Sequence, residues 1–213
     1  MATREHPTST RLVINDNYNS FWFVSKKNYS LNLKEDEKIR NSIIKIFNKI
    51  YKSTDIIENI FLEKKINFIK INIKVFTSLK LKNSNINIEE RLFETISKIL
   101  NTNQIKLSLI IKKVEKPYEN SKFIIKYIEL QLRNKISFTK LTNQILELIE
   151  TKTDVKGIQI QISGRLYGKD RAFVTWAREG QVPLQTIKSN INYCSKSIKI
   201  WCGMLGIKVW IAL

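Results

Sequence analysis

The sequence has very few of the residues from which metal and catalytic centres are built. Its 213 residues include one histidine, His6, and two cysteines, Cys194 and Cys202. A zinc site needs four nitrogen or sulfur ligands, or three and a water, so three such residues in all argue against one. Two cysteines do not make a disulfide framework. We therefore expect no metal, no cofactor and no catalytic residue in this chain.

Long apolar runs and glycine are also scarce. No run reaches the roughly 18 residues that a membrane-spanning helix needs, and the start lacks the apolar core of a signal peptide, so no membrane partner is expected. All six glycines lie in residues 157–213. Because glycine permits positive φ and close backbone approach, special backbone geometry is expected only in the C-terminal part.

Basic residues outnumber acidic residues in this chain. Lysine and arginine number 37 against 19 aspartates and glutamates, which gives a formal net charge of +18. Isoleucine, lysine and asparagine, whose codons are rich in A and T, make up 84 of the 213 residues. Part of the lysine surplus therefore reflects an A/T-rich genome, as in an organelle or a reduced bacterium. Residues 157–213 hold 8 basic and 2 acidic residues, and this imbalance favours a nucleic-acid partner.

The first half of the chain predicts an α-β-β-α-β order. Apolar residues recur at helical spacing or alternate with polar ones, and each period predicts one kind of element. The predicted elements are a helix over 34–52, a short apolar run at 56–62, a strand over 67–75, a helix over 88–100 and a strand over 104–112. Residues 1–30 have no clear period and are expected to be an arm that packs its aromatic residues on a neighbouring domain.

The second half predicts two helices followed by four strands, which is a second α+β domain. The helices are expected over 119–133 and 137–150, and the strands over 157–163, 170–178, 187–201 and 207–212. Arg165, Arg171 and Arg178 lie within a 14-residue stretch of this region, with aromatic residues between them. Arginine suits phosphate and aromatic faces stack on bases, although the tryptophans are expected to lie in the core.

Catalytic patterns are weak in the same region. Asp170 and Glu179 are nine positions apart on a predicted strand, which would place them on opposite faces. Gly164-x-x-x-Gly168 is not followed by the Gly-Lys-Ser/Thr of a phosphate-binding loop. Cys194 and Cys202 are best interpreted as buried free thiols. These residues do not predict an enzyme.

Three motifs near the C-terminus are far more specific than the composition. They are Ser163-Gly-Arg-Leu-Tyr-Gly168, Trp176-Ala-Arg-Glu-Gly-Gln-Val-Pro-Leu-Gln-Thr186 and Gly206-Ile-Lys-Val-Trp-Ile211. In order and spacing they resemble the C-terminal domain of the bacterial-type ribosomal protein S3 family. His6-Pro7, Arg11-Leu12 and Trp22-Phe23 resemble the opening pattern of the same family.

The resemblance implies an α+β protein in three parts. These are an N-terminal arm over residues 1–30, a type II KH-like domain over 31–115, and a C-terminal domain over 116–213 with two helices packed on a four-stranded sheet. It implies a structural component of the small-subunit head, which contacts rRNA, mRNA at its entrance channel, and the neighbouring proteins S10 and S14. The residues expected to bind rRNA are Arg4, Arg11, Arg165, Lys169, Arg171, Arg178 and Lys188.

The chain departs from the family pattern at three functional places. The KH loop expected between residues 75 and 88 contains no glycine, so the GXXG clamp is absent and only Lys80 and Lys82 remain as point charges. Of the basic motif expected at the mRNA entrance, Lys140 alone remains. Phe173 stands in place of a family arginine, and Arg171, two residues away on the predicted strand, is expected to compensate.

Two other functions stay open at this point. One is a basic nuclease or repair-type enzyme outside the ribosome, although no carboxylate cluster has metal-ligand spacing. The other is a free RNA chaperone of KH type, which the absence of GXXG disfavours. The Ile/Lys/Asn bias, and a match to the family that begins almost at Met1, predict a protein made inside an organelle. A plastid is favoured over a mitochondrion or a reduced bacterium.

Overall fold

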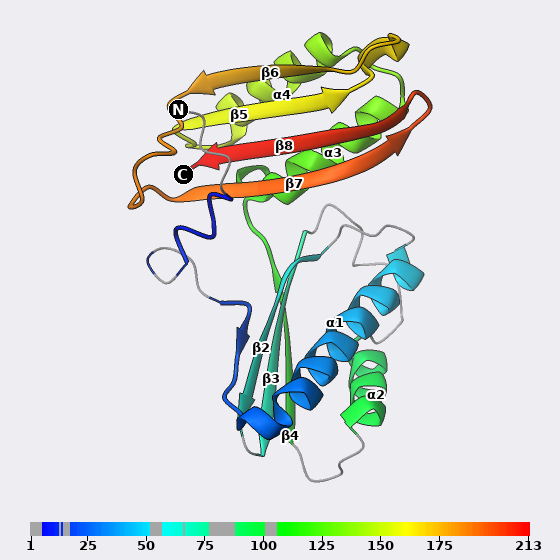
Figure 1. Ribbon diagram of the computed structural model, residues 1–213. Helices are drawn as coiled ribbons and strands as arrows, with labels where there is room; N and C mark the ends of the chain where they lie inside the picture. The colour runs from blue at the N-terminus through cyan, green and yellow to red at the C-terminus, as the bar shows by residue number, and fades with distance from the viewer. Residues whose placement is uncertain are drawn as a thin grey trace. The chain divides into compact units, whose positions relative to one another are not determined.

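The computed structural model describes residues 6–12, 14, 18–51, 57–65, 67–76, 88–100 and 106–213. The chain divides into two compact units (Figure 1). One comprises Tyr18–Glu115, and the other combines Met1–Asn17 with Lys116–Leu213. We refer to them as the N-terminal and C-terminal units. Each unit has helices, a sheet and a buried hydrophobic core of its own, so the predicted mixed α+β class is confirmed.

The N-terminal unit is a sheet with helices on one side (Figure 1). Along the chain its elements are β1 (Ser20–Phe21), a 3-10 turn (Lys26–Asn28), α1 (Tyr29–Tyr51), β2 (Ile57–Lys65), β3 (Phe68–Val75), α2 (Ile88–Leu100) and β4 (Lys106–Lys113). The sheet order is β1-β2-β3-β4, with β2 and β3 antiparallel and the other two pairings parallel. Alternate residues of β3, Ile69, Ile71 and Ile73, pack against Ile39 and Ile43 of α1 in the core.

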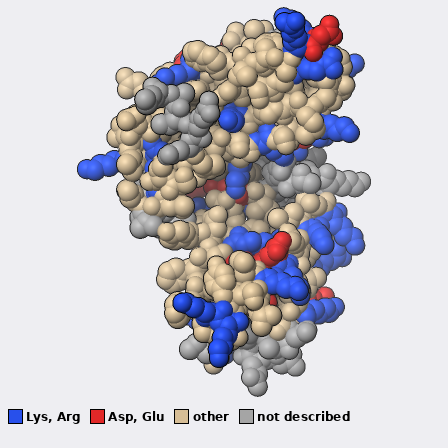
Figure 2. Space-filling model, viewed as in Figure 1, with Lys and Arg blue, Asp and Glu red and all other residues tan. Residues whose placement is uncertain are grey.

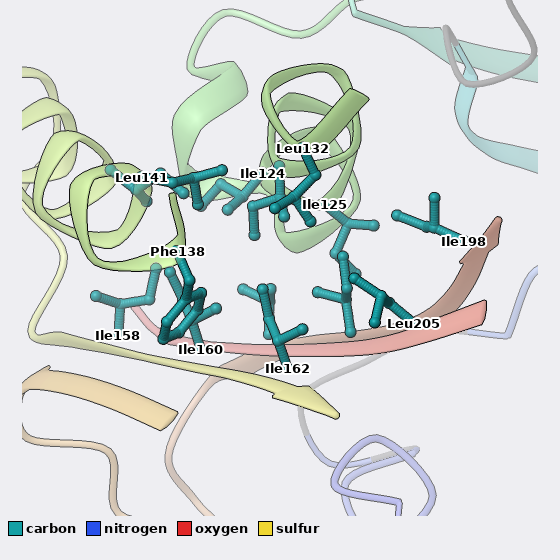
Figure 3. Packing of buried hydrophobic residues seen from close by; sticks show 14 of the residues in the cluster. Ile124, Ile125, Leu132, Phe138, Leu141, Ile158, Ile160, Ile162, Ile198 and Leu205 are labelled. Atoms are coloured by element: carbon teal, nitrogen blue, oxygen red, sulfur yellow. The ribbon is translucent and has the colours of Figure 1, made fainter. Parts of the chain in front are cut away.

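The C-terminal unit places two helices on one face of an antiparallel sheet. Along the chain its elements are a 3-10 turn (Pro117–Glu119), α3 (Ser121–Arg133), α4 (Phe138–Lys152), β5 (Gly157–Gly164), a 3-10 turn (Leu166–Gly168), β6 (Phe173–Gly180), β7 (Ile191–Ile200) and β8 (Gly203–Ala212). The strand order is β6-β5-β8-β7. Figure 3 shows the core, with Ile158, Ile160 and Ile162 of β5 directed toward the helices.

This alternation also defines the opposite face of the sheet. Because successive side chains of a strand point to opposite faces, the residues paired with Gln159 and Gln161 point away from α3 and α4. The register aligns Gln161 with Trp176 of β6 on one side and with Lys208 of β8 on the other. We call this surface the open face.

The structure corrects three predictions about the elements. The arm over residues 1–30 is not one segment, because the division between the units falls after Asn17, residues 20–21 form β1 and α1 already begins at Tyr29. The predicted helix start at Lys34 is therefore five residues late. Strand β6 begins at Phe173, so Asp170 and Arg171 precede it.

No helix in the described ranges is both long and apolar enough to span a membrane.

Candidate nucleic-acid interface

The connection between β5 and β6 carries three of the predicted cations. Arg165 donates from Nε to the carbonyl oxygen of Lys169 at 2.9 Å, and its Nη2 lies 4.0 Å from Oδ1 of Asp170. The ammonium of Lys169 lies 5.2 Å from the centroid of the Phe173 ring. The Asp170 carboxylate is fully exposed, so solvent screens its ion pair and leaves the Arg165 guanidinium able to meet a phosphate.

Arg171 is exposed, but it does not compensate for Phe173 in the predicted way. That prediction required both residues to share one face of a strand, and Arg171 lies before β6 begins. The residue instead extends the cationic β5–β6 connection by one positive charge. The prediction that Asp170 and Glu179 occupy opposite strand faces fails for the same reason.

Lys140 lies at the same end of the C-terminal unit. It is exposed on the first turn of α4. The start of this helix is fixed against the β5–β6 connection, because Ser137 and Phe138 line a cavity of about 120 Å³ together with Leu166 and Trp201. We call Lys140, Arg165, Lys169 and Arg171 the loop-end cations.

Arg178 and Lys188 lie at the other end of the sheet. Antiparallel pairing of Gly157 with Gly180 and of Gly164 with Phe173 places the residues after β6 far from the β5–β6 connection. Arg178 is exposed on the open face, and its Nη2 approaches the carbonyl oxygen of Val182 at 3.5 Å, the limit for a hydrogen bond. The structure therefore separates the predicted contacts into two groups.

Arg11 has a different role from the predicted one. Its side chain is 2% exposed and therefore does not face a phosphate. The guanidinium donates to the carbonyl oxygens of Pro7, Leu184, Thr186 and Ser189 at 2.9–3.0 Å. The prediction of Arg11 as an rRNA contact is corrected: this residue fastens the N-terminal segment to the connection between β6 and β7.

Three predicted site residues lie outside the described residues. They are Arg4, Lys80 and Lys82. The glycine-free loop that contains the two lysines falls between β3 and α2, where the sequence places it.

The exposed tryptophans contradict the prediction that these side chains lie in the core. Trp176 is 68% exposed on β6, and Trp201 is 65% exposed at the turn between β7 and β8. A usable sequence signal existed for Trp176, since Val174, Trp176 and Arg178 alternate with Phe173, Thr175 and Ala177, which places the tryptophan on the same strand face as an arginine. An arginine on the same face marks the side of the strand that faces solvent.

A pair of carboxyl groups escaped the sequence analysis. The protonated carboxyl of Glu179 on β6 donates a hydrogen bond to the carboxyl group of Glu150 on α4, and this bond, with burial and like charge adding to it, raises the pKa of Glu179. Within the described ranges, no three His, Cys, Asp or Glu residues are placed to hold a metal ion. Cys194 and Cys202 are thiols outside any disulfide, and they are half-buried against the core rather than fully buried as predicted.

The surface charge is predominantly positive. Figure 2 shows lysine and arginine side chains scattered over the visible face of both units, with few aspartates or glutamates among them. A field of this sign attracts polyanions without selecting a sequence.

Comparisons with known proteins give one consistent result. Residues 128–211 match the family described as ribosomal protein S3, C-terminal domain. The small ribosomal subunit protein uS3c of Dioscorea elephantipes is 42% identical over 215 residues, which cover 99% of each chain. The uS3c proteins of Ipomoea purpurea and Ginkgo biloba are 42% and 40% identical, over 100% and 99% of this chain and 99% and 98% of the relatives.

Proposed function

Because this chain belongs to the ribosomal protein uS3 family, in its plastid-type branch, we propose that it binds rRNA in the plastid small ribosomal subunit and helps to form the mRNA entrance. Membership confirms the resemblance that the motifs indicated. The family is structural and not enzymatic, so the nuclease alternative is abandoned. What the proposal adds is how this chain contacts RNA.

The group of loop-end cations is the observation that carries the proposal. Arg165, Lys169 and Arg171 lie within seven residues of one connection, and the one carboxylate between them is fully exposed. Arginine forks match phosphate oxygens with two parallel hydrogen bonds. Each phosphate neutralised by such a side chain releases counterions, so binding here is expected to weaken steeply with salt.

The N-terminal unit fits a type II KH-like domain with a changed loop. Its α1-β2-β3-α2-β4 order agrees with the predicted element order, and the segment between β3 and α2 contains no glycine. A GXXG loop clamps the nucleic-acid backbone through close main-chain approach. Without it, Lys80 and Lys82 supply charge alone, and we expect weak binding of single strands that is independent of sequence.

Lys140 is the proposed contact to mRNA at the entrance channel. It is exposed on the first turn of α4, on the same end of its unit as the β5–β6 connection. The neighbouring head proteins S10 and S14 are the proposed protein partners. Because Lys140 stands alone where a full basic motif would supply a cluster of charges, we expect this chain to contribute less to the unwinding of mRNA structure.

The decisive experiment is mass spectrometry of small subunits purified from plastids that express a tagged copy of this chain. We expect the wild-type chain in the subunit at moderate salt. A triple variant of Arg165→Gln, Lys169→Gln and Arg171→Gln should be depleted from subunits and lost at lower salt. The matched control removes three exposed lysines of α1, by Lys34→Gln, Lys38→Gln and Lys45→Gln. Absence of the wild-type chain from small subunits would refute the proposal.

A further inference from the structure

The open face of the C-terminal sheet has an unusual composition for a surface without a helix over it. Its outward side chains come from all four strands: Gln159, Gln161, Ser163, Val174, Trp176, Arg178, Tyr193, Ser195, Ser197, Lys199, Met204, Lys208 and Trp210. None of them is acidic, three are cationic, and three are aromatic. The remaining members are mainly amides and hydroxyls, which hydrogen-bond in either direction.

The register arranges these side chains in rows across the strands. One row contains Trp176, Gln161 and Lys208, and the next contains Arg178, Gln159 and Trp210. Adjacent strands are about 4.8 Å apart and alternate residues about 7 Å apart along a strand. Trp176 therefore has a guanidinium beside it on its own strand and an ammonium two strands away.

The β7–β8 side and the β6 side of the open face differ in how their aromatic residues are covered. His6 packs edge-on against Tyr193 with 4.6 Å between ring centroids, and Tyr193 lies 5.2 Å from Trp210. These three rings cover one another, so Trp210 is half-buried. Trp176 has no ring contact with any described residue and presents most of its indole to solvent. The stacking surface is thus on the β6 side.

We propose that the open face binds a short stretch of single-stranded RNA, with an unpaired base stacked on Trp176 and phosphates held by Arg178 and Lys208. This inference rests on the proposed ribosomal function and names a second RNA contact beyond the loop-end cations. Aromatic rings beside a positively charged groove bind single strands because every base has a face that stacks. The two glutamines supply donors and acceptors for base edges.

The same composition argues against a protein as the occupant. The fully buried centre of a protein–protein interface is depleted of charged residues, and lysine in particular is disfavoured there. Here Lys208 lies in the middle of the sheet, on β8, and no described acidic residue pairs with it or with Arg178. A protein would have to bring acidic groups to both cations, whereas an RNA strand supplies phosphates along its length.

The test measures binding of the full-length chain to an oligouridine of about 12 nucleotides, a length within the range that one nucleic-acid-binding fold covers. Trp176→Ala is expected to weaken binding roughly tenfold or more, the loss typical of one stacked base. Trp176→Phe should retain most of the affinity because a ring is still present. Leu130→Ala is the control, since this exposed apolar side chain lies on α3, on the helical side of the unit and away from the open face, and it should bind as the wild type does.

Two results would overturn the inference. Equal affinity of wild type, Trp176→Ala and Leu130→Ala would show that the open face does not stack bases. Unchanged RNA affinity of Trp176→Ala, combined with loss of a neighbouring protein from small subunits that contain it, would show that the face docks protein. In both cases the wild-type chain is still present in small subunits, so the proposed function stands; its failure would appear separately, as absence of the wild-type chain.

Discussion

Arg11 and Ser189 are joined by a hydrogen bond of 3.0 Å from Nε to the carbonyl oxygen, although 178 positions separate them in the chain. Further bonds from the same guanidinium reach the carbonyl oxygens of Leu184 and Thr186. Three carbonyls of one loop thus share a single buried cation. The segment that precedes the N-terminal unit is thereby part of the C-terminal unit.

Replacing Arg11 is therefore expected to destabilise the C-terminal unit. Arg11→Ala should lower its free energy of unfolding by about 2–4 kcal/mol, because several carbonyls lose a charged donor at once. Arg11→Lys should recover little, since an ammonium lacks the planar fork that reaches several acceptors. Urea unfolding followed by tryptophan fluorescence measures both. The control is Lys188→Gln, which alters an exposed residue of the same loop; unchanged stability of Arg11→Ala would contradict the assignment.

The stability of the N-terminal unit should depend on pH through Asp36. Burial alone raises the pKa of this carboxyl, but hydrogen bonds from Ser20 and Trp22 and the charge of Arg40 outweigh it, so the pKa is lowered from 3.8. The resulting stabilisation is fully present above pH 3.8 and is lost as the pH falls through the lower folded-state pKa. These contacts also hold β1 to α1.

Asp36→Asn should accordingly be less stable than wild type by about 2 kcal/mol at neutral pH. The difference should shrink in acid, once the wild-type carboxyl is protonated. Urea unfolding across a pH series gives the comparison, and Glu37→Gln on the exposed side of α1 is the control. A difference that persisted unchanged in strong acid would show that charge is not the cause.

Ion pairs of Glu129 should stabilise the C-terminal unit against unfolding. This carboxylate is 5% exposed on α3 and lies 2.6 Å from Arg133, 3.3 Å from Lys196 of β7 and 3.6 Å from Lys126. The carboxylate is buried, but the Arg133 side chain is 57% exposed and that of Lys196 is 36% exposed, so solvent screens part of each ion pair. Glu129→Gln should cost about 1–2 kcal/mol in urea unfolding, whereas Glu147→Gln, on the exposed side of α4, should be close to neutral. Equal effects of the two variants would refute this role.

Two glycines of the sheet should respond differently to alanine. A Cβ at Gly157 would lie 2.5 Å from the backbone nitrogen of Gln181, whereas a Cβ at Gly206 would meet only the side-chain oxygen of Ser163 at 2.8 Å. A hydroxyl can rotate away and a backbone cannot. We expect Gly157→Ala to cost about 1–3 kcal/mol or more and Gly206→Ala clearly less, as thermal unfolding would show. The reverse order would contradict the packing around β5.

Local patterns predicted most of the fold. Alternation at Ile158, Ile160 and Ile162 identified both the strand and its buried face, because the period of two is a property of the backbone itself. Helical spacing placed α3 and α4 to within two residues at each end. The predictions failed where neighbours outside the local segment decide the outcome, as at the start of β6, which is set by its pairing with Gly164.

The candidate site was predicted less well than the fold. Motif positions identified Arg165, Arg178 and Lys188 as rRNA contacts, and the structure leaves all three exposed. Motif positions could not distinguish Arg11 from these residues, because the residue type alone does not show whether an arginine is buried or exposed. Nor could they show that Arg178 lies at the other end of the sheet from Arg165.

The sequence by itself determined the family, the order of helices and strands, the positive charge and the missing GXXG loop, because these depend on residue identity and short-range period. Only the tertiary structure decided which side chains meet solvent. The alternation of residues along β6 predicts that Trp176 and Thr175 point to opposite faces of the sheet. It does not predict which of the two faces the helices cover. That depends on α3 and α4 packing against the isoleucine side of β5, which leaves Trp176 exposed on the other side. Arg11 is buried for a different reason, since its guanidinium donates to the carbonyl oxygens of Leu184, Thr186 and Ser189.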